Sequence, residues 1–204
     1  MTKEIPTTLS PVAAVSDASG LVPATSVWLR SGGIVLAGSA LVAVCAHLAL
    51  PLFFTPVPLS MAPFAVLVLG LVLSPRLAAA TLGAYLLEGA AGLPVFGPSP
   101  AIVGLAHLFG PTGGYLLSYP LAAVLIALMA KRMGRGFTPS AVAAFAGSLV
   151  ILLCGAVWLG VLTHGSVQSV FSLAVLPFLP GDALKVAAAA GLAAGWARLR
   201  RRNA

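Results

Sequence analysis

The sequence predicts an all-α integral membrane protein with six transmembrane helices and both termini on the cytoplasmic side. Of its 204 residues, 60% are hydrophobic and 7% are charged, whereas a soluble domain carries about 25% charged residues. Its apolar segments are long enough to cross a bilayer. Its basic residues, as shown below, gather on one side of the membrane if the chain crosses six times.

Residues 1–27 are rich in Ser, Thr, Pro, Ala and Val and have no sustained apolar period. They predict a flexible cytoplasmic tail, and they lack the basic start, apolar core and cleavage site of a signal peptide. Residues 28–204 then form a single six-helix transmembrane domain.

The expected spans occupy about residues 28–54, 56–73, 77–93, 113–130, 139–162 and 182–199. Prolines 56, 58 and 63 predict a short or broken second helix. Such backbone is tolerated at membrane depth only where protein buries it or where it lines a cavity. Residues 95–112 are apolar but interrupted by Pro and Gly, so we expect an extracytoplasmic loop that caps the bundle.

The orientation follows from the basic residues. Arg30, Arg76, the cluster at Lys131 and the cluster at Arg200 all fall on one side if there are six spans, and Lys and Arg are enriched in cytoplasmic connections. Five or seven spans would break this agreement. Topology therefore explains nearly all of the net charge of +7, and no nucleic-acid partner is needed.

Three charges remain in the outer half of the predicted bundle: Glu88, Asp182 and Lys185. Ionisable residues inside a membrane are functional-site hypotheses by default. Tyr85 precedes Glu88 by three residues, which places both on neighbouring positions of one helix face. Glu88 could instead reach interfacial water, and Tyr85 could serve only in packing.

Asp182 and Lys185 begin the last span, within P-F-L-P-G-D-A-L-K. One reading is structural, with Asp182 as the helix N-cap and Lys185 as its ion-pair partner. The other is a binding site. A lysine near a helix N-terminus is unfavourable with respect to the helix dipole, whereas a bound carboxylate would be stabilised by both the lysine and the dipole. Asp182 could then accept N–H donors from the same small anionic ligand.

The sequence offers no sign of catalysis. It contains no phosphate-binding G-x-x-x-x-G-K-[ST] loop and no H-E-x-x-H, G-x-S-x-G or C-x-x-C motif, and its three histidines lack metal-ligand spacing. We therefore expect no enzyme, no metal and no cofactor. An outward-facing polar pocket favours capture of a solute; the rival is a small intramembrane enzyme.

Four motifs together resemble the BioY family of biotin-specific substrate-binding (S) subunits of energy-coupling-factor (ECF) transporters. They are P-V-P-L-S at residues 56–60, Y-L-L-E-G-A-A-G-L-P-V-F at 85–96, G-P-T-G-G-Y-L-L at 110–117, and P-F-L-P-G-D-A-L-K at 177–185. The resemblance extends over about residues 35–195. It implies a six-helix S-component bundle that takes up biotin from outside, in the cytoplasmic membrane of a bacterium.

The resemblance also implies roles for individual residues. Asp182 would hold the ureido ring and Lys185 the valerate carboxylate, while Tyr85 and Glu88 would line the pocket. Besides biotin and membrane lipid, the partners would be a transmembrane coupling protein and ATPase subunits. Small residues of the first helix would dock on the coupling protein, which here are Ser39 and Ala43.

The first of these motifs, together with the three residues after it, departs from the family pattern. Where the family commonly has P-I-T-L-Q-T, this chain has P-L-S-M-A-P, so that Ser60 retains a hydroxyl group but Ala62 and Pro63 replace Gln and Thr. Hydrogen-bonding side chains that the family carries are therefore missing here. A site for another small anionic vitamin is the alternative.

Overall fold

The structure is a computed structural model that describes residues 24–97, 104–134 and 136–202. Of the predicted tail, residues 1–23 lie outside the described part of the chain, and residues 24–27 belong to the first helix. In chain order the elements are α1 (Ala24–His47), β1 (Ala49–Leu50), β2 (Leu59–Ser60), α2 (Ala62–Val72), α3 (Pro75–Ala90), α4 (Leu105–Leu108), α5 (Gly113–Met133), α6 (Phe137–Thr163), α7 (Val167–Ala174) and α8 (Leu179–Arg202).

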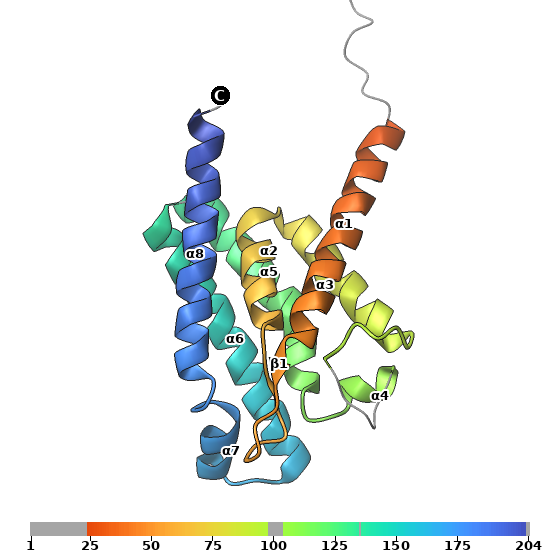
Figure 1. Ribbon diagram of the computed structural model, residues 1–204, viewed down its shortest axis with the longest axis vertical. Coiled ribbons are helices and arrows are strands. Elements are labelled where there is room, and N and C mark those ends of the chain that lie inside the picture. The colour runs from red at the N-terminus through yellow and green to blue at the C-terminus, as the bar shows by residue number, and fades with distance from the viewer. Residues whose placement is uncertain (1–23, 98–103, 135, 203–204) are drawn as a thin grey trace, which may run out of the picture.

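Six of these helices (α1, α2, α3, α5, α6 and α8) correspond to the six predicted spans and form one bundle (Figure 1). The second is short, as its prolines predicted, with 11 residues. Despite its length it is central, since it contacts α1, α3, α5, α6 and α8. The buried core accordingly contains most of this helix, including Val66, Leu67 and Leu71.

The first helix is shorter than predicted. It ends at His47, and residues 49–50 form a strand that pairs antiparallel with residues 59–60. The reason is Pro51, because the residue before a proline is biased away from helical backbone. The expected first span thus becomes a helix followed by a β-hairpin whose loop begins at Pro51.

Helices α5 and α6 pack closely because three glycines lie at their interface. A Cβ atom at Gly114 would meet Trp158 and come within 2.7 Å of the Cys154 carbonyl oxygen. Similarly, Gly147 lies against Ile126, and Gly155 against the ring of Tyr115. Small residues allow membrane helices to approach each other in this way. The two helices therefore form a tightly fitted wall.

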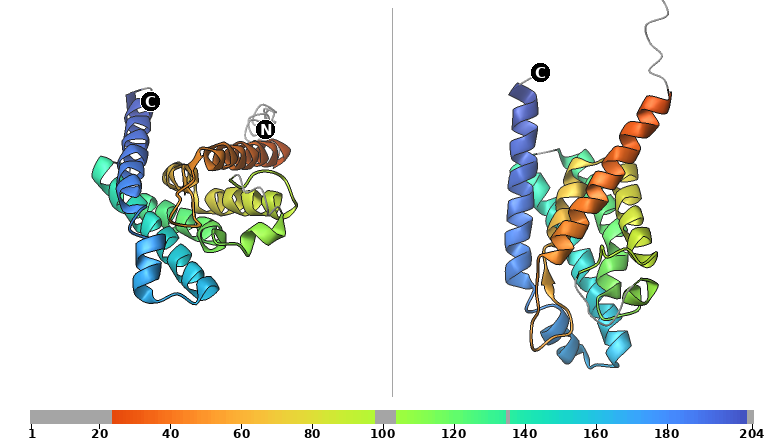
Figure 2. Two further views of the ribbon diagram at one scale, coloured as in Figure 1. Left: turned by 60° about the horizontal axis from the view of Figure 1, so that its bottom comes forward. Right: turned by 45° about the vertical axis from the view of Figure 1, so that its right-hand side comes forward.

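The basic residues lie at one end of the bundle. Ser74 between α2 and α3, Lys131 of α5 and Arg200 of α8 line one hollow there. The start of α1 and the C-terminal end of α8 lie at the same end in Figures 1 and 2, whereas the hairpin, α4 and α7 lie at the opposite end. This arrangement agrees with the prediction that the basic residues gather on one side, while the side that faces the cytoplasm stays a prediction.

Three helices in the described part of the chain are long and apolar enough to cross a membrane: α1 from Trp28, α5 and α6. A fourth candidate is the pair α7 and α8, which is bent by 49°. The remaining two bundle helices are shorter, with 11 residues in α2 and 16 in α3. The chain is thus an all-helical, multi-pass membrane protein, while six crossings stay a prediction.

Replacing Gly114 with Ala should lower the free energy of unfolding by about 1–3 kcal/mol, because the added methyl group has to push α5 and α6 apart. Thermal unfolding of the purified protein in detergent measures this. The control is Gly191→Ala in α8, where a Cβ atom meets nothing within 4 Å; it should be neutral or slightly stabilising. Equal stability of the two variants would contradict close α5–α6 packing.

Candidate ligand-binding site

A cavity lies at the end of the bundle opposite to the basic residues. Its walls are the loop between β1 and β2, the start of α2, the middle of α3, the α3–α5 connection and the start of α5. The centre of a water molecule can move in about 160 Å³ of it. The lining residues are Ala46, Pro56, Val57, Pro58, Ser60, Ala62, Pro63, Tyr85, Gly97, His107, Gly110, Pro111, Thr112, Tyr115, Leu116 and Tyr119.

Both predictions about these connections are therefore supported. The proline-rich segment before α2 lines a cavity, as irregular backbone at membrane depth should. The described part of the α3–α5 connection covers the same cavity, and the Trp158 indole N–H fixes it to α6 by donating to the Gly110 carbonyl oxygen at 2.9 Å. Residues 98–103 of that connection lie outside the described part of the chain.

Three tyrosines form the inner wall. Tyr85 is fully buried; its ring stacks on that of Tyr119 with centroids 6.4 Å apart and meets Phe96 edge-on at 5.4 Å. The Tyr85 hydroxyl group has no hydrogen-bond partner among the described residues. Because an unpaired buried hydroxyl is costly, this group is the strongest sign in the cavity of a polar ligand atom.

The helix α7 is attached to the tyrosine wall and to the hairpin loop by one hydrogen bond each. The Tyr115 hydroxyl donates to the carbonyl oxygen of Ala174 at 2.7 Å, and the Thr55 hydroxyl donates to that of Leu173 at 2.9 Å. The first of these donors lines the cavity and the second belongs to the hairpin loop. The C-terminal end of α7 is thereby held beside the site.

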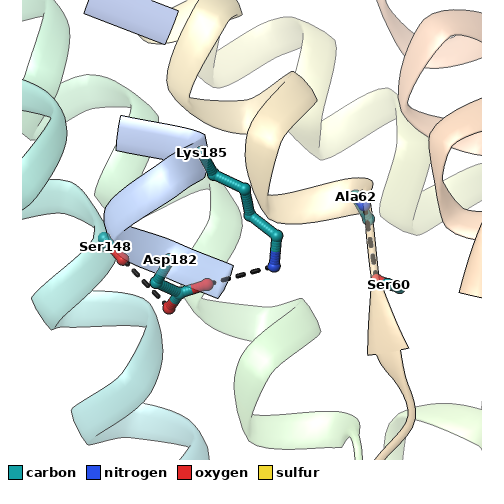
Figure 3. A network of polar contacts seen from close by, with 5 residues as sticks. All are labelled: Ser60, Ala62, Ser148, Asp182 and Lys185. Atoms are coloured by element: carbon teal, nitrogen blue, oxygen red, sulfur yellow. Dashed lines mark hydrogen bonds and ion pairs between the residues drawn. The ribbon is translucent and has the colours of Figure 1, made fainter. Parts of the chain in front are cut away.

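The acid and the base of the last span form a buried ion pair. The Lys185 ammonium group lies 3.0 Å from Asp182 Oδ1, and both residues are less than 10% exposed. The Ser148 hydroxyl of α6 donates to Asp182 Oδ2 at 3.1 Å (Figure 3). The ion pair that the structural interpretation of these two residues predicted is therefore present.

The other part of that reading is wrong, because Asp182 is not the N-cap. The helix α8 begins at Leu179, and the Asp182 N–H already bonds to the carbonyl oxygen of Phe178 at 2.8 Å. The Pro-Gly sequence before Asp182 does not delay the helix, since proline is tolerated in a first turn. Asp182 and Lys185 therefore project from consecutive turns into the bundle.

The ion pair adjoins the cavity but does not line it. Figure 3 shows the Lys185 side chain extending from α8 toward the segment from Ser60 to Ala62, and this segment does line the cavity. Asp182 is close enough to interact electrostatically with Tyr115 and Tyr119. Of the predicted residues, Ser60, Tyr85, Asp182 and Lys185 are thus gathered around one site.

Glu88 lies elsewhere. Its carboxylate accepts a hydrogen bond from the Ser39 hydroxyl of α1 at 2.9 Å, and it is not among the residues that line the cavity. The side chains of two helical residues three apart point in directions that differ by about 60°. This difference is enough for Tyr85 to face α5 while Glu88 faces α1. The structure therefore places Tyr85 in the lining of the cavity, as expected, but not Glu88.

The same contact bears on the predicted docking residues. Ser39 is 2% exposed because it faces α3, so the structure does not present it to a partner. Ala43 is partly buried. This helix instead exposes Gly33, Ala37 and Ala40, spaced four and three apart, and Gly32 beside them.

Sequence reasoning missed Tyr115, Tyr119 and Ser148. The two tyrosines have a detectable signal, since a spacing of four places them on one face at the start of a span. Ser148 has none, because a single hydroxyl in an apolar helix commonly bonds within the helix. Within the described residues no group of three His, Cys, Asp or Glu side chains could hold a metal ion.

Replacing Lys185 with Met should lower the free energy of unfolding by about 3–5 kcal/mol, because it leaves the buried Asp182 carboxylate without its partner. Adding Asp182→Asn to this variant should recover part of the loss, which thermal unfolding in detergent detects. Lys131→Met, at an exposed lysine, is the matched control and should change stability by less than about 0.5 kcal/mol. If Lys185→Met lowered the free energy of unfolding no more than Lys131→Met does, the result would argue against a buried ion pair.

Comparison with known proteins agrees with this architecture. The chain is 39% identical over 134 residues to the probable biotin transporter BioY of Pyrococcus horikoshii, covering 66% of this chain and 76% of that protein. It is 32% identical over 157 residues to the biotin transporter BioY2 of Lactococcus lactis, covering 77% and 84%.

A crystal structure of the S-component for biotin from an ECF-type ABC transporter has the same fold. It superposes with a TM-score of 0.76 at 23% identity and covers 88% of this chain and 95% of that one. The sequence model described as the BioY family matches residues 17–202. The chain therefore belongs to the BioY family.

Proposed function

We propose that this protein is the biotin-binding S-component of an ECF-type transporter and captures its ligand from the extracytoplasmic side. The observation that carries the proposal is the match to the BioY family over residues 17–202. The site supports it independently, because a cavity lined by aromatic and apolar residues adjoins one buried acid and one buried base.

The chemistry of biotin suits this arrangement. Its thiophane ring and its valeryl chain are largely apolar and would lie against Tyr85, Tyr119 and the prolines before α2. The ligand's carboxylate would bind Lys185, and its ureido N–H groups would donate to Asp182. Pockets of this kind combine apolar walls with a few fixed polar groups that set orientation.

Ser60 lies between the cavity and Lys185. Its hydroxyl oxygen accepts a bond from the Ala62 N–H at 3.3 Å, which leaves its proton free for a ligand oxygen. This hydroxyl group is the one polar side chain that the segment retains where the family commonly carries Gln and Thr as well. We therefore assign Ser60 to the ligand.

The partners follow from the same proposal. The chain has no phosphate-binding loop, so ATPase subunits and a transmembrane coupling protein would supply energy and movement. We place the contact with the coupling protein on the exposed small residues Gly33, Ala37 and Ala40, in place of Ser39. Since one relative comes from Pyrococcus horikoshii, the cytoplasmic membrane concerned need not be bacterial.

The direct test is equilibrium binding of biotin to the purified protein in detergent. Wild type should bind, and Lys185→Ala and Asp182→Asn should lose binding. Tyr85→Phe should weaken it about tenfold, the value of one buried hydrogen bond. This variant removes only an unpaired hydroxyl group, so its fold is preserved.

Ser172→Ala is the control, because the Ser172 hydroxyl bonds to a carbonyl of its own exposed helix. A folded wild-type protein that binds no biotin would overturn the proposal, and other small anionic vitamins would then be screened.

Six crossings and cytoplasmic termini are tested by labelling single cysteines in intact cells with an impermeant thiol reagent. Phe53→Cys, Leu93→Cys and Ser166→Cys should react from outside, whereas Ser74→Cys and Gly134→Cys should react only after the membrane is opened, because the positions alternate between the two ends of the bundle. Native cysteines are first replaced with Ala. Reaction of Ser74→Cys from outside would show that α2 does not cross.

A further inference from the structure

The carboxylate of Asp182 is held from two sides by two different helices. Lys185, one turn further along α8, contacts Oδ1 at 3.0 Å, and Ser148 of α6 contacts Oδ2 at 3.1 Å. Figure 3 shows Ser148 and Lys185 on opposite sides of the carboxylate, with Lys185 directed toward the cavity wall. Each carboxylate oxygen thus has its own donor.

The Ser148 contact is the fixed one of the two. Its residue is 5% exposed, and its hydroxyl group is attached to the backbone by a single rotatable bond. The preceding residue, Gly147, lies directly against Ile126 of α5. Lys185, in contrast, reaches Asp182 at the end of a four-carbon chain with many conformations.

A carboxylate with one fixed donor cannot rotate freely about its terminal torsion. Without Ser148, the two oxygens could exchange and the plane of the group could turn, so Lys185 would follow Asp182 away from the segment at Ser60. A hydrogen bond to a charged acceptor is also about twice as strong as a neutral one. Orientation of the acid therefore decides where the base points.

We propose that Ser148 is a positioning residue for the ligand site: its hydroxyl group fixes the plane of the Asp182 carboxylate and thereby aims Lys185 at the ligand. The proposal rests on the proposed function for the identity of that ligand. It adds α6, through Ser148, to the elements that build the site. Ser148 acts through Asp182 and needs no contact with the ligand.

A buried serine could also serve only to fill space. The chain offers a matched control for that role in Ser140, two turns earlier on the same helix. Ser140 is 1% exposed, and its hydroxyl group has no hydrogen-bond partner among the described residues. Ser140→Ala and Ser148→Ala therefore remove the same atom from the same helix, and only the second removes a bond to Asp182.

The first measurement is biotin affinity. Ser148→Ala should weaken binding about tenfold, as expected for one hydrogen bond to a charged group, whereas Ser140→Ala should not change it. Ser148→Thr retains the hydroxyl group and should restore most of the affinity.

The second measurement needs no ligand. The chain has two aspartates, Asp17 and Asp182, so selective ¹³C labelling of aspartate carboxyl carbons gives two NMR signals, and Asp182→Asn identifies the second. Ser148→Ala should shift that signal and Ser140→Ala should leave it in place. An unchanged Asp182 signal in Ser148→Ala would overturn the proposal. Equal biotin affinities of Ser148→Ala and Ser140→Ala would overturn it as well.

The two proposals fail in different ways. A wild-type protein that binds no biotin removes the proposed function, while the NMR signal still shows whether Ser148 holds Asp182. A wild-type protein that binds biotin tightly, with Ser148→Ala indistinguishable from Ser140→Ala, leaves the function intact and removes the role of Ser148.

Discussion

The buried ion pair between Asp182 and Lys185 is the constraint on which the site depends. Moving an ion out of water costs several kcal/mol even after relaxation, so each charge is tolerated only because the other is 3.0 Å away. The pair is electrically neutral as a unit, yet its two ends still carry opposite charges. A ligand that has both N–H donors and a carboxylate can therefore bind to it without leaving either charge unpaired.

The architecture around the pair explains why the polar groups are concentrated there. In a membrane the backbone has to satisfy its own hydrogen bonds, and irregular segments survive only inside the protein. Parts of the two irregular stretches, before α2 and before α5, line the cavity. The same constraint that excludes loops from the bilayer thus creates a cavity with backbone and side-chain polar groups at its rim.

Much of the fold could be predicted from the sequence because the signals are local. The apolar runs of α5 and α6 and the prolines before α2 determine those elements without reference to the rest of the chain. The helix end at His47 was missed by seven residues, since the hydropathy of the following segment outweighed the single proline at position 51. Local composition describes where a chain can be helical, and one residue can decide where it stops.

The site was less predictable, for a reason visible in Glu88. An acid in a predicted span signals that something pairs with it, but the sequence does not say whether this is a ligand or a neighbouring helix. Here the partner is Ser39, and only the packing of α1 on α3 reveals it. Ser148 presents the converse case: its role depends on Asp182, 34 residues away, and no pattern in α6 indicates it.

The distribution of the site over the chain bears on how binding could drive transport. Its walls come from the hairpin, the start of α2, α3, the α3–α5 connection and α5, and the ion pair of α8 adjoins them. The helix α2 contacts α1, α3, α5 and α8. A ligand that bridges Lys185 and the tyrosine wall would draw α8 toward α5 and α2. Because α2 also packs against α1, this movement would alter the surface that α1 presents to a partner. A ligand shifts a conformational equilibrium only when it binds the two states unequally. If the two states differ in the distance between α8 and α5, a ligand that contacts both helices binds one state more tightly than the other.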